Sequence, residues 1–255
     1  KGVGGRYDSF QNNPELLPLV DRSLVKSTEF FTEDDIMAYP FQTEVSLQDW
    51  HFKKDAPYRS ASDIVLQLMQ NVSRNGSLLL NITQRGRGDI EQQARIICED
   101  IGLWLKTNSE AVYGSRPFDV WGDGHIIYSR NDGYIYVTMI DWDGSETILE
   151  PLSSSAPSVG IISEVSLLED PELEIKFVQS DKGLSVKAEG HLLANPAIRD
   201  TVLSRGFKVL KIRHDKNWFN DDDPGVTTIG WNRKCNLGRG DFNNDLYFTE
   251  NPGDV

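Results

Sequence analysis

The chain has 255 residues, 38% of them hydrophobic, with a formal net charge of −13 at neutral pH and a pI near 4.7. This hydrophobic content is that of an ordinary globular protein, and the length suffices for one large core or two modest ones. The negative charge repels phosphate backbones and anionic lipid, so we expect no nucleic-acid binding. No apolar run approaches the length of a membrane span, so we expect no span.

The first half of the chain carries the pattern of an α/β layer. Residues 62–75 place apolar side chains on one helical face, and we expect this helix to end in a left-handed cap at Gly76. The run from Ser77 to Ile82 is short and apolar at consecutive positions, as in a parallel strand buried on both faces. A second helix follows, with Asp89 as its predicted N-cap.

From Tyr113 onward the hydrophobic pattern has period two. Residues 125–130 and 134–140 flank the turn Asn131-Asp132-Gly133, the pattern of an antiparallel hairpin. Turn residues separate most of the further strands, which we expect at 161–168, 173–179, 184–188 and 207–213. Together these segments predict a β-sandwich. The only two cysteines, Cys98 and Cys235, lie in a helical pattern and a polar loop, so we expect free thiols.

Several stretches closely resemble the end of the catalytic domain of family-29 glycoside hydrolases, the α-L-fucosidases. The matching stretches are residues 40–52 (PFQTEVSLQDWHF), 58–61 (YRSA), 72–81 (VSRNGSLLLN) and 102–117 (GLWLKTNSEAVYGSRP). The resemblance implies a distorted (β/α) barrel with its site at the carboxyl ends of the strands. It also implies a glycosidase that needs no cofactor and acts outside the cytoplasm.

The resemblance implies a fold that combines α/β and all-β parts. Because such a barrel takes about 200 residues or more, we expect an incomplete (β/α)8-like barrel followed by an antiparallel β-sandwich. The predicted boundaries are 1–112 for the barrel portion, 113–216 for the sandwich and 217–255 for a tail or the start of an accessory sandwich. We therefore expect a missing N-terminal part of the barrel as a partner, and a chain that is inactive alone.

Glu29 is the predicted acid/base residue. A retaining glycosidase needs a carboxylate nucleophile and a second carboxyl group that acts first as acid and then as base. Glu29 lies thirteen residues before Gln42, which resembles the family's spacing between its acid/base glutamate and a Gln-Thr-acidic motif. The flanking Thr28, Phe30 and Phe31 are expected to form an apolar wall. The family's nucleophilic aspartate matches no position of this chain.

Glu44 is the rival acid, because it ends a predicted strand, where barrel enzymes carry their catalytic residues. The resemblance implies hydrogen bonding to substrate for Glu44 and for Gln42 on the same face, and a structural salt bridge is an equally open reading of Glu44. Trp50 is the predicted sugar platform, since an indole can cover the apolar side of a 6-deoxy sugar. His51 beside it is a weaker candidate for a hydroxyl contact.

The remaining candidates are weaker. Asn81 follows a strand at the correct end of the barrel but could equally bond a neighbouring loop. Trp104 and Trp121 are expected in the core. Residues 241–245 (DFNND) alternate oxygen ligands like a calcium loop but lack its later glycine and glutamate, so we expect no metal.

Three functional readings stay open from the sequence. The first is a retaining exo-α-L-fucosidase acting on fucosylated oligosaccharides or polysaccharides. The second is a non-catalytic carbohydrate-binding or structural remnant, suggested by the acidic turn at 221–224 and by Gly230-Trp231. The third is a hydrolase of a related sugar or of a fucose-containing polysaccharide.

Overall fold

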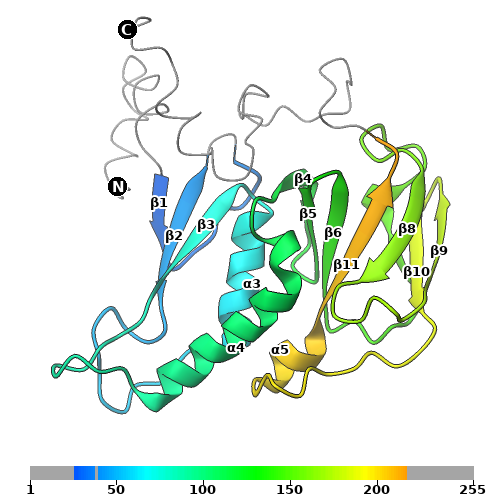
Figure 1. The fold of residues 1–255 in the computed structure, drawn as a ribbon. Coiled ribbons are helices and arrows are strands. Elements are labelled where there is room, and N and C mark those ends of the chain that lie inside the picture. The colour runs from blue at the N-terminus through cyan, green and yellow to red at the C-terminus, as the bar shows by residue number, and fades with distance from the viewer. Residues whose placement is uncertain (1–25, 38–39, 217–255) are drawn as a thin grey trace, which may run out of the picture.

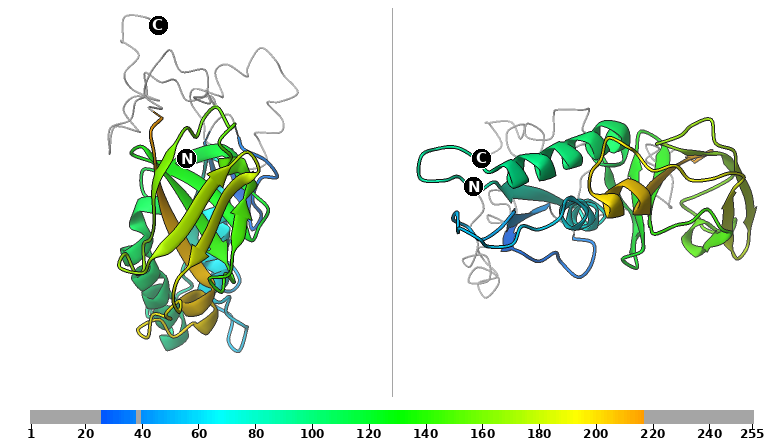
Figure 2. Two further views of the ribbon diagram at one scale, coloured as in Figure 1. Left: turned by 90° about the vertical axis from the view of Figure 1, so that its right-hand side faces the viewer. Right: turned by 90° about the horizontal axis from the view of Figure 1, so that it is seen from below.

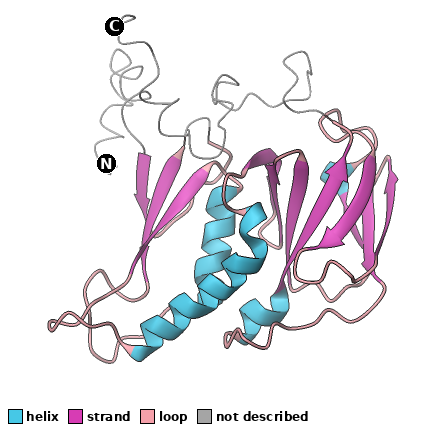
Figure 3. Cartoon of the chain, viewed as in Figure 1, coloured by secondary structure: helices cyan, strands magenta, loops and turns pink. Residues whose placement is uncertain are grey.

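The computed structural model describes residues 26–37 and 40–216 (Figure 1). It contains a small parallel sheet, two long helices beside it and a β-sandwich on the far side of the helices (Figure 1, Figure 3). The predicted tail at 217–255, the calcium candidate at 241–245 and Cys235 lie outside the described residues. Cys98 is partly buried and is a free thiol.

The parallel sheet has three strands, β1 (Lys26–Glu29), β2 (Phe41–Ser46) and β3 (Gly76–Asn81), in the order β1-β2-β3. Helix α3 (Ala61–Val72) connects β2 to β3, and helix α4 (Gln92–Asn108) follows β3. Both helices lie on the same side of the sheet (Figure 1). This arrangement confirms the predicted α/β layer.

Helix α3 begins at a capping box. The Ser60 side chain accepts a hydrogen bond from the backbone N–H of Asp63, and the Asp63 carboxylate accepts one from the backbone N–H of Ser60. The predicted cap at Gly76 is wrong: the helix ends at Val72, and Asn75 adopts the left-handed conformation (φ 75°). Gly76 instead begins β3, where a Cβ atom would approach the Phe41 ring within 2.4 Å.

Two further expectations for this layer are corrected. Helix α4 begins at Gln92 with Glu91 as N-cap, because the Asp89 carboxylate is bound by Arg87 and cannot cap the helix. Strand β3 is covered on one face only within the described residues: its burial alternates, and Leu79 is 43% exposed. Within the described residues, the predicted burial of this strand on both faces is therefore not met.

The β-sandwich consists of two antiparallel sheets. The larger has the order β4-β5-β6-β11-β8 and the smaller β7-β10-β9. The strands of the larger sheet are β4 (Arg116–Gly122), β5 (Ile126–Asn131), β6 (Tyr134–Ile140), β8 (Ile162–Leu167) and β11 (Phe207–His214); those of the smaller are β7 (Thr147–Leu149), β9 (Ile175–Ser180) and β10 (Gly183–Ala188). The predicted hairpin turn is confirmed, with Asp132 and Gly133 both at positive φ. Strand β7 and helix α5 (Thr201–Gly206) were not predicted.

The larger sheet has two buried faces. Side chains such as Ile135, Val137 and Leu210 face the smaller sheet and form one hydrophobic core. Their neighbours in sequence, among them Tyr136 and Val209, face α3 and α4 and belong to the second core, which the helices share. The sandwich and the helical layer are therefore packed together (Figure 2). The predicted boundary between residues 112 and 113 stays a prediction.

Hydrogen bonds across this junction fix the two parts relative to each other. The Asp200 carboxylate caps α5 and also accepts a hydrogen bond from the backbone N–H of Ser62 at the start of α3 (2.8 Å). The buried Asp100 carboxylate on α4 accepts from the Arg199 guanidinium and from the backbone N–H of Asp200, both at 2.9 Å. One loop of the sandwich therefore holds the start of α3 and the middle of α4.

Candidate functional site

The carboxyl ends of β1, β2 and β3 meet at one edge of the parallel sheet, at its lower end in Figure 1. Glu29 is the last residue of β1 and is the register partner of Glu44 on β2. Register partners on neighbouring strands lie about 5 Å apart and point to the same face. Gln42, two residues before Glu44, shares that face. The opposite face carries Thr43 and Val45, which are fully buried towards the helices.

The two glutamates differ in their contacts. The Glu44 carboxylate accepts hydrogen bonds from the Ser27 hydroxyl (2.9 Å) and the Gln42 amide (3.3 Å). The Glu29 side chain is exposed and makes no hydrogen bond or ion pair with the residues that the structure describes. Glu44 is therefore held in place by its own strand and its neighbour, whereas Glu29 has no such contact among the residues that the structure describes.

Trp50 lies in the loop that follows β2, and the end of β3 fixes its backbone. The Asn81 amide donates to the Trp50 carbonyl oxygen (3.1 Å) and to the Ser46 hydroxyl (2.9 Å). The backbone N–H of Trp50 in turn donates to the Asp49 carboxylate (2.8 Å). Of the two readings of Asn81, the structure therefore gives the bond to a neighbouring loop. His51 is exposed.

Phe30 follows Glu29 in the sequence, and its ring contacts the ring of Trp50. Its ring lies 4.9 Å from the Trp50 ring, centroid to centroid, in a tilted arrangement. The expected apolar wall around Glu29 is only partly correct. Thr28 is buried on the helix side of the sheet, because successive strand residues alternate in direction, and Phe31 is 64% exposed. Of the three residues that flank Glu29, only Phe30 packs its ring against Trp50 at the carboxyl edge.

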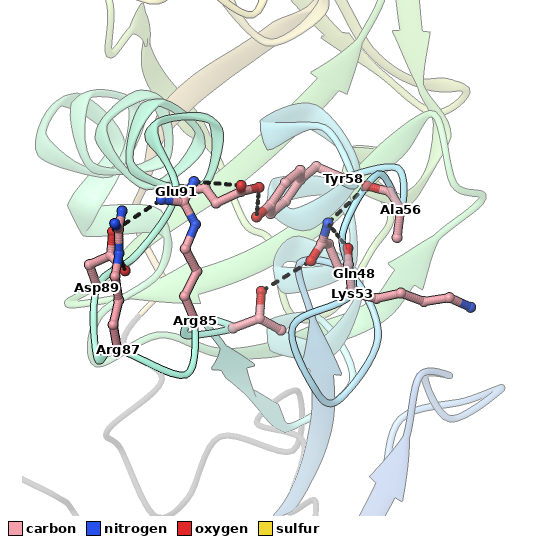
Figure 4. Close-up of polar contacts among 9 residues, drawn as sticks. Gln48, Lys53, Ala56, Tyr58, Arg85, Arg87, Asp89 and Glu91 are labelled. Atoms are coloured by element: carbon pink, nitrogen blue, oxygen red, sulfur yellow. Dashed lines mark hydrogen bonds and ion pairs between the residues drawn. The ribbon is translucent and has the colours of Figure 1, made fainter.

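The loops after β2 and β3 are joined by a polar network (Figure 4). Arg85 pairs with Glu91 (2.6 Å) and Asp89 (3.1 Å), and the Tyr58 hydroxyl donates to Glu91 (3.0 Å). The hydrogen bonds from Arg87 lower the pKa of Asp89 to about 2. The sequence signal for this network is the pair of arginines at positions 85 and 87, followed at the same spacing by the acids at positions 89 and 91.

In the same loop after β2, Gln48 braces the segment that carries Trp50. Its amide donates to the Ala56 carbonyl oxygen at 2.8 Å, and its side-chain oxygen accepts from the Thr83 hydroxyl at 3.4 Å (Figure 4). The Arg85 guanidinium lies 5.9 Å from the centre of the Phe52 ring. The Trp50 loop is thus attached to β3 and to the loop after it by several contacts, which preorganises the surface beside the two glutamates.

A cavity of about 570 Å³ lies between the segment after β1 and helix α3. Arg74 and Trp121 are among the residues that line it, and the Arg74 guanidinium carbon lies 3.5 Å from the centre of the Trp121 ring. Trp121 is therefore partly exposed and not a core residue, contrary to expectation, whereas Trp104 is buried as predicted. The described residues contain no group of three or more His, Cys, Asp or Glu side chains arranged to bind a metal.

The model of the α-L-fucosidase family matches residues 16–110. This part of the chain is therefore similar in sequence to the α-L-fucosidase family. The matched region contains all five predicted α-L-fucosidase site residues, namely Glu29, Gln42, Glu44, Trp50 and His51. A relative, the tissue α-L-fucosidase of Rattus norvegicus, is 30% identical over 142 residues, which are 51% of this chain and 30% of the relative. The chain thus spans about a third of that α-L-fucosidase.

Solved α-L-fucosidase structures share the fold. Isoenzyme 1 of Paenibacillus thiaminolyticus superposes with a TM-score of 0.61 at 18% identity, over 75% of this chain and 45% of that one. A trapped covalent intermediate of the Bacteroides thetaiotaomicron α-L-fucosidase, in complex with 2-fluoro-fucosyl fluoride, gives a TM-score of 0.61 at 14% identity, over 75% and 43%. At these identities the superpositions concern the fold alone. Among the described helices, none is long and apolar enough to cross a membrane.

Proposed function

We propose that this chain is the C-terminal part of a retaining α-L-fucosidase, which releases terminal α-L-fucose from glycans through a covalent glycosyl-enzyme. The observation that carries the proposal is the place of Glu29. It lies inside the family match, at the carboxyl end of a parallel strand, in register with Glu44 and beside Phe30 and Trp50. Barrel enzymes carry their catalytic residues at this end of their strands.

The three-stranded sheet forms the last part of an incomplete (β/α)8-like barrel in this proposal. Its open face carries Gln42, Glu44 and Leu79, and the remaining strands of the barrel come from the length of the α-L-fucosidases that this chain does not span. The nucleophile, an aspartate, belongs to that missing part. The covalent intermediate seen in the Bacteroides thetaiotaomicron enzyme supports the retaining course.

The proposed mechanism uses Glu29 twice. In the first step the aspartate attacks the anomeric carbon of fucose while Glu29 donates its proton to the glycosidic oxygen, and the rest of the glycan leaves as an alcohol. In the second step Glu29 takes a proton from water, and the resulting hydroxide displaces the aspartate and frees the sugar. The exposed carboxylate of Glu29, without a partner in the described residues, can accept either role.

The neighbouring residues bind the sugar. The Trp50 ring covers the methyl group and the apolar side of fucose. Gln42, Glu44 and His51 bind its hydroxyls. Glu44 is better suited to accept a hydrogen bond than to donate a proton, because its carboxylate already accepts from Ser27 and Gln42. The substrate is a fucosylated oligosaccharide or polysaccharide.

The test uses the full-length protein and two substrates, a fucosylated trisaccharide and 4-nitrophenyl α-L-fucoside. The nitrophenolate leaves without help from an acid, so Glu29→Gln should lower kcat/KM on the trisaccharide by about 10²–10⁴-fold and change it far less on the aryl fucoside. Glu44→Gln should lower kcat/KM on both substrates alike. Hydrolysis of neither substrate by the wild-type protein, or the selective loss appearing in Glu44→Gln instead, would overturn the proposal.

A further inference from the structure

The chain makes a strained turn immediately after Glu29. Phe30 has φ 65°, a left-handed conformation that is uncommon for a residue with a side chain and unfavourable for a bulky one. Its backbone N–H still donates to the Glu44 carbonyl oxygen (2.9 Å), continuing the ladder between β1 and β2. The turn therefore begins at the last residue of β1, and its shape decides how Glu29 and the Phe30 ring are presented at the carboxyl edge.

Two successive carbonyl groups of this turn are bound by side chains from other elements. The Gln67 amide on α3 donates to the Phe30 carbonyl oxygen at 2.9 Å. The Thr28 and Thr43 hydroxyls donate to the Phe31 carbonyl oxygen at 2.9 and 3.2 Å. Strained backbone conformations persist where the surroundings over-determine them, and here a helix and two strands do so.

Gln67 is itself oriented by Arg59. The Arg59 guanidinium donates to the Gln67 side-chain oxygen at 2.9 Å. Because a guanidinium has no acceptor, this contact requires the oxygen of Gln67 to face Arg59 and leaves its NH₂ group to face Phe30. Gln67 is 7% exposed, so water does not compete easily for either bond. The Arg59 backbone N–H donates to the Leu47 carbonyl oxygen (2.8 Å), which ties this pair to the start of the Trp50 loop.

We propose that Gln67 is a positioning residue: its hydrogen bond to the Phe30 carbonyl holds the turn that orients Glu29 for proton transfer and seats the Phe30 ring against Trp50. The proposal rests on the proposed function for Glu29 and names the residue behind the sheet on which it depends. Gln67 lies on the helix side, touches no substrate, and acts through the backbone of its neighbour. Proton transfer is steeply sensitive to the placement of the acid, so a buried amide can affect it from a distance.

Two variants of the full-length protein separate positioning from packing. Gln67→Glu keeps the size of the side chain and its acceptor for Arg59 but, once ionised, has no donor for the Phe30 carbonyl; Gln67→Leu removes both bonds. Each should lower kcat/KM on the fucosylated trisaccharide by about tenfold and leave kcat/KM on 4-nitrophenyl α-L-fucoside within about twofold. The matched control is Gln70→Leu, one turn along α3, whose side chain makes no bond to the turn. Equal losses on both substrates, or no loss, would overturn the proposal.

A second readout needs no activity. The NMR signal of the Trp50 indole N–H reports the Phe30 ring beside it. This signal is identified as the one that disappears from the spectrum of this chain in the variant Trp50→Phe. It should shift or broaden in both Gln67 variants and stay in place in Gln70→Leu. An unchanged signal in folded Gln67→Glu would show that the hydrogen bond from Gln67 does not fix the conformation of the turn at Phe30. If the full-length protein hydrolysed neither substrate, the proposed function would fail and with it the role in proton transfer, whereas the indole signal would still decide whether Gln67 fixes Phe30 against Trp50.

Discussion

The parallel layer and the β-sandwich bury their strands in different ways. In the sandwich, both faces of the larger sheet are covered, one by the smaller sheet and one by the helices. In the parallel layer, α3 and α4 cover one face, and the other is polar except for the exposed Leu79. More apolar side chains are therefore buried by strands of the sandwich, whereas one face of β1–β3 is left uncovered by the described residues, as the proposed barrel requires.

The largest expected effect comes from truncating the sandwich core. Leu184 on β10 is fully buried, so Leu184→Ala should lower the free energy of unfolding by about 2–5 kcal/mol through lost burial and a cavity. Leu79→Ala on the open face should change it by less than about 0.5 kcal/mol. Chemical denaturation of this chain measures both values.

The same pair of variants tests how the open face is used. In the full-length protein the cost of Leu79→Ala should rise towards that of a core leucine, because the completed barrel covers β3. An equal, small cost in both forms would contradict the proposed barrel.

A smaller effect is expected from a buried acid at the junction of helix and sandwich. Burial raises the pKa of Glu169 to about 7, against the attraction of Lys208, from an ordinary value of 4.5. The folded chain therefore binds more protons than the unfolded chain between about pH 4.5 and 7, and this contribution to the free energy of unfolding falls as the pH rises through that window, by up to about 3 kcal/mol.

Glu169→Gln should remove this contribution. Urea denaturation at half-unit steps from pH 4.5 to 7.5 should give a free energy of unfolding that falls less with pH in the variant than in the wild-type chain. His214, whose pKa burial lowers to about 4, contributes in the opposite direction in both proteins, so the difference between them isolates Glu169. Parallel pH curves for the two proteins would refute the assignment.

The smallest effect concerns the cap of the helix that the two regions share. Ser60→Ala removes the side-chain acceptor at the start of α3 and should lower the free energy of unfolding by about 1 kcal/mol. Ser154→Ala, at an exposed position in the sandwich without a side-chain hydrogen bond, is the matched control and should have no measurable effect. Equal effects of both substitutions would show that the capping box contributes nothing.

The sequence predicts the regular elements better than their ends. The apolar stripe of α3 and the Asn131-Asp132-Gly133 turn depend on local patterns, and both are confirmed. The start of α4 is wrong, because Asp89 prefers the arginine two residues before it, a competition that capping rules do not weigh. The predicted burial of β3 on both faces is not met within the described residues, because a run of leucines cannot show what covers each face.

The five predicted site residues remain a prediction from the spacing between Glu29 and Gln42 and from the family motifs; the structure shows that Glu29 and Glu44 are in register on neighbouring strands. The contacts of Gln67 were not predictable, because they join positions 30, 59 and 67 across three elements. Only the fold brings these positions together, and no period or motif in the sequence marks them.

The most direct test of the central claim is the distance between the Glu29 carboxylate and the nearest aspartate carboxylate in a crystal structure of the full-length protein. A retaining glycosidase with Glu29 as acid/base requires an aspartate from the missing part of the barrel at about 5–5.5 Å. A separation of about 6.5–9.5 Å would indicate an inverting enzyme. An aspartate facing Glu44 with none near Glu29 would contradict the account.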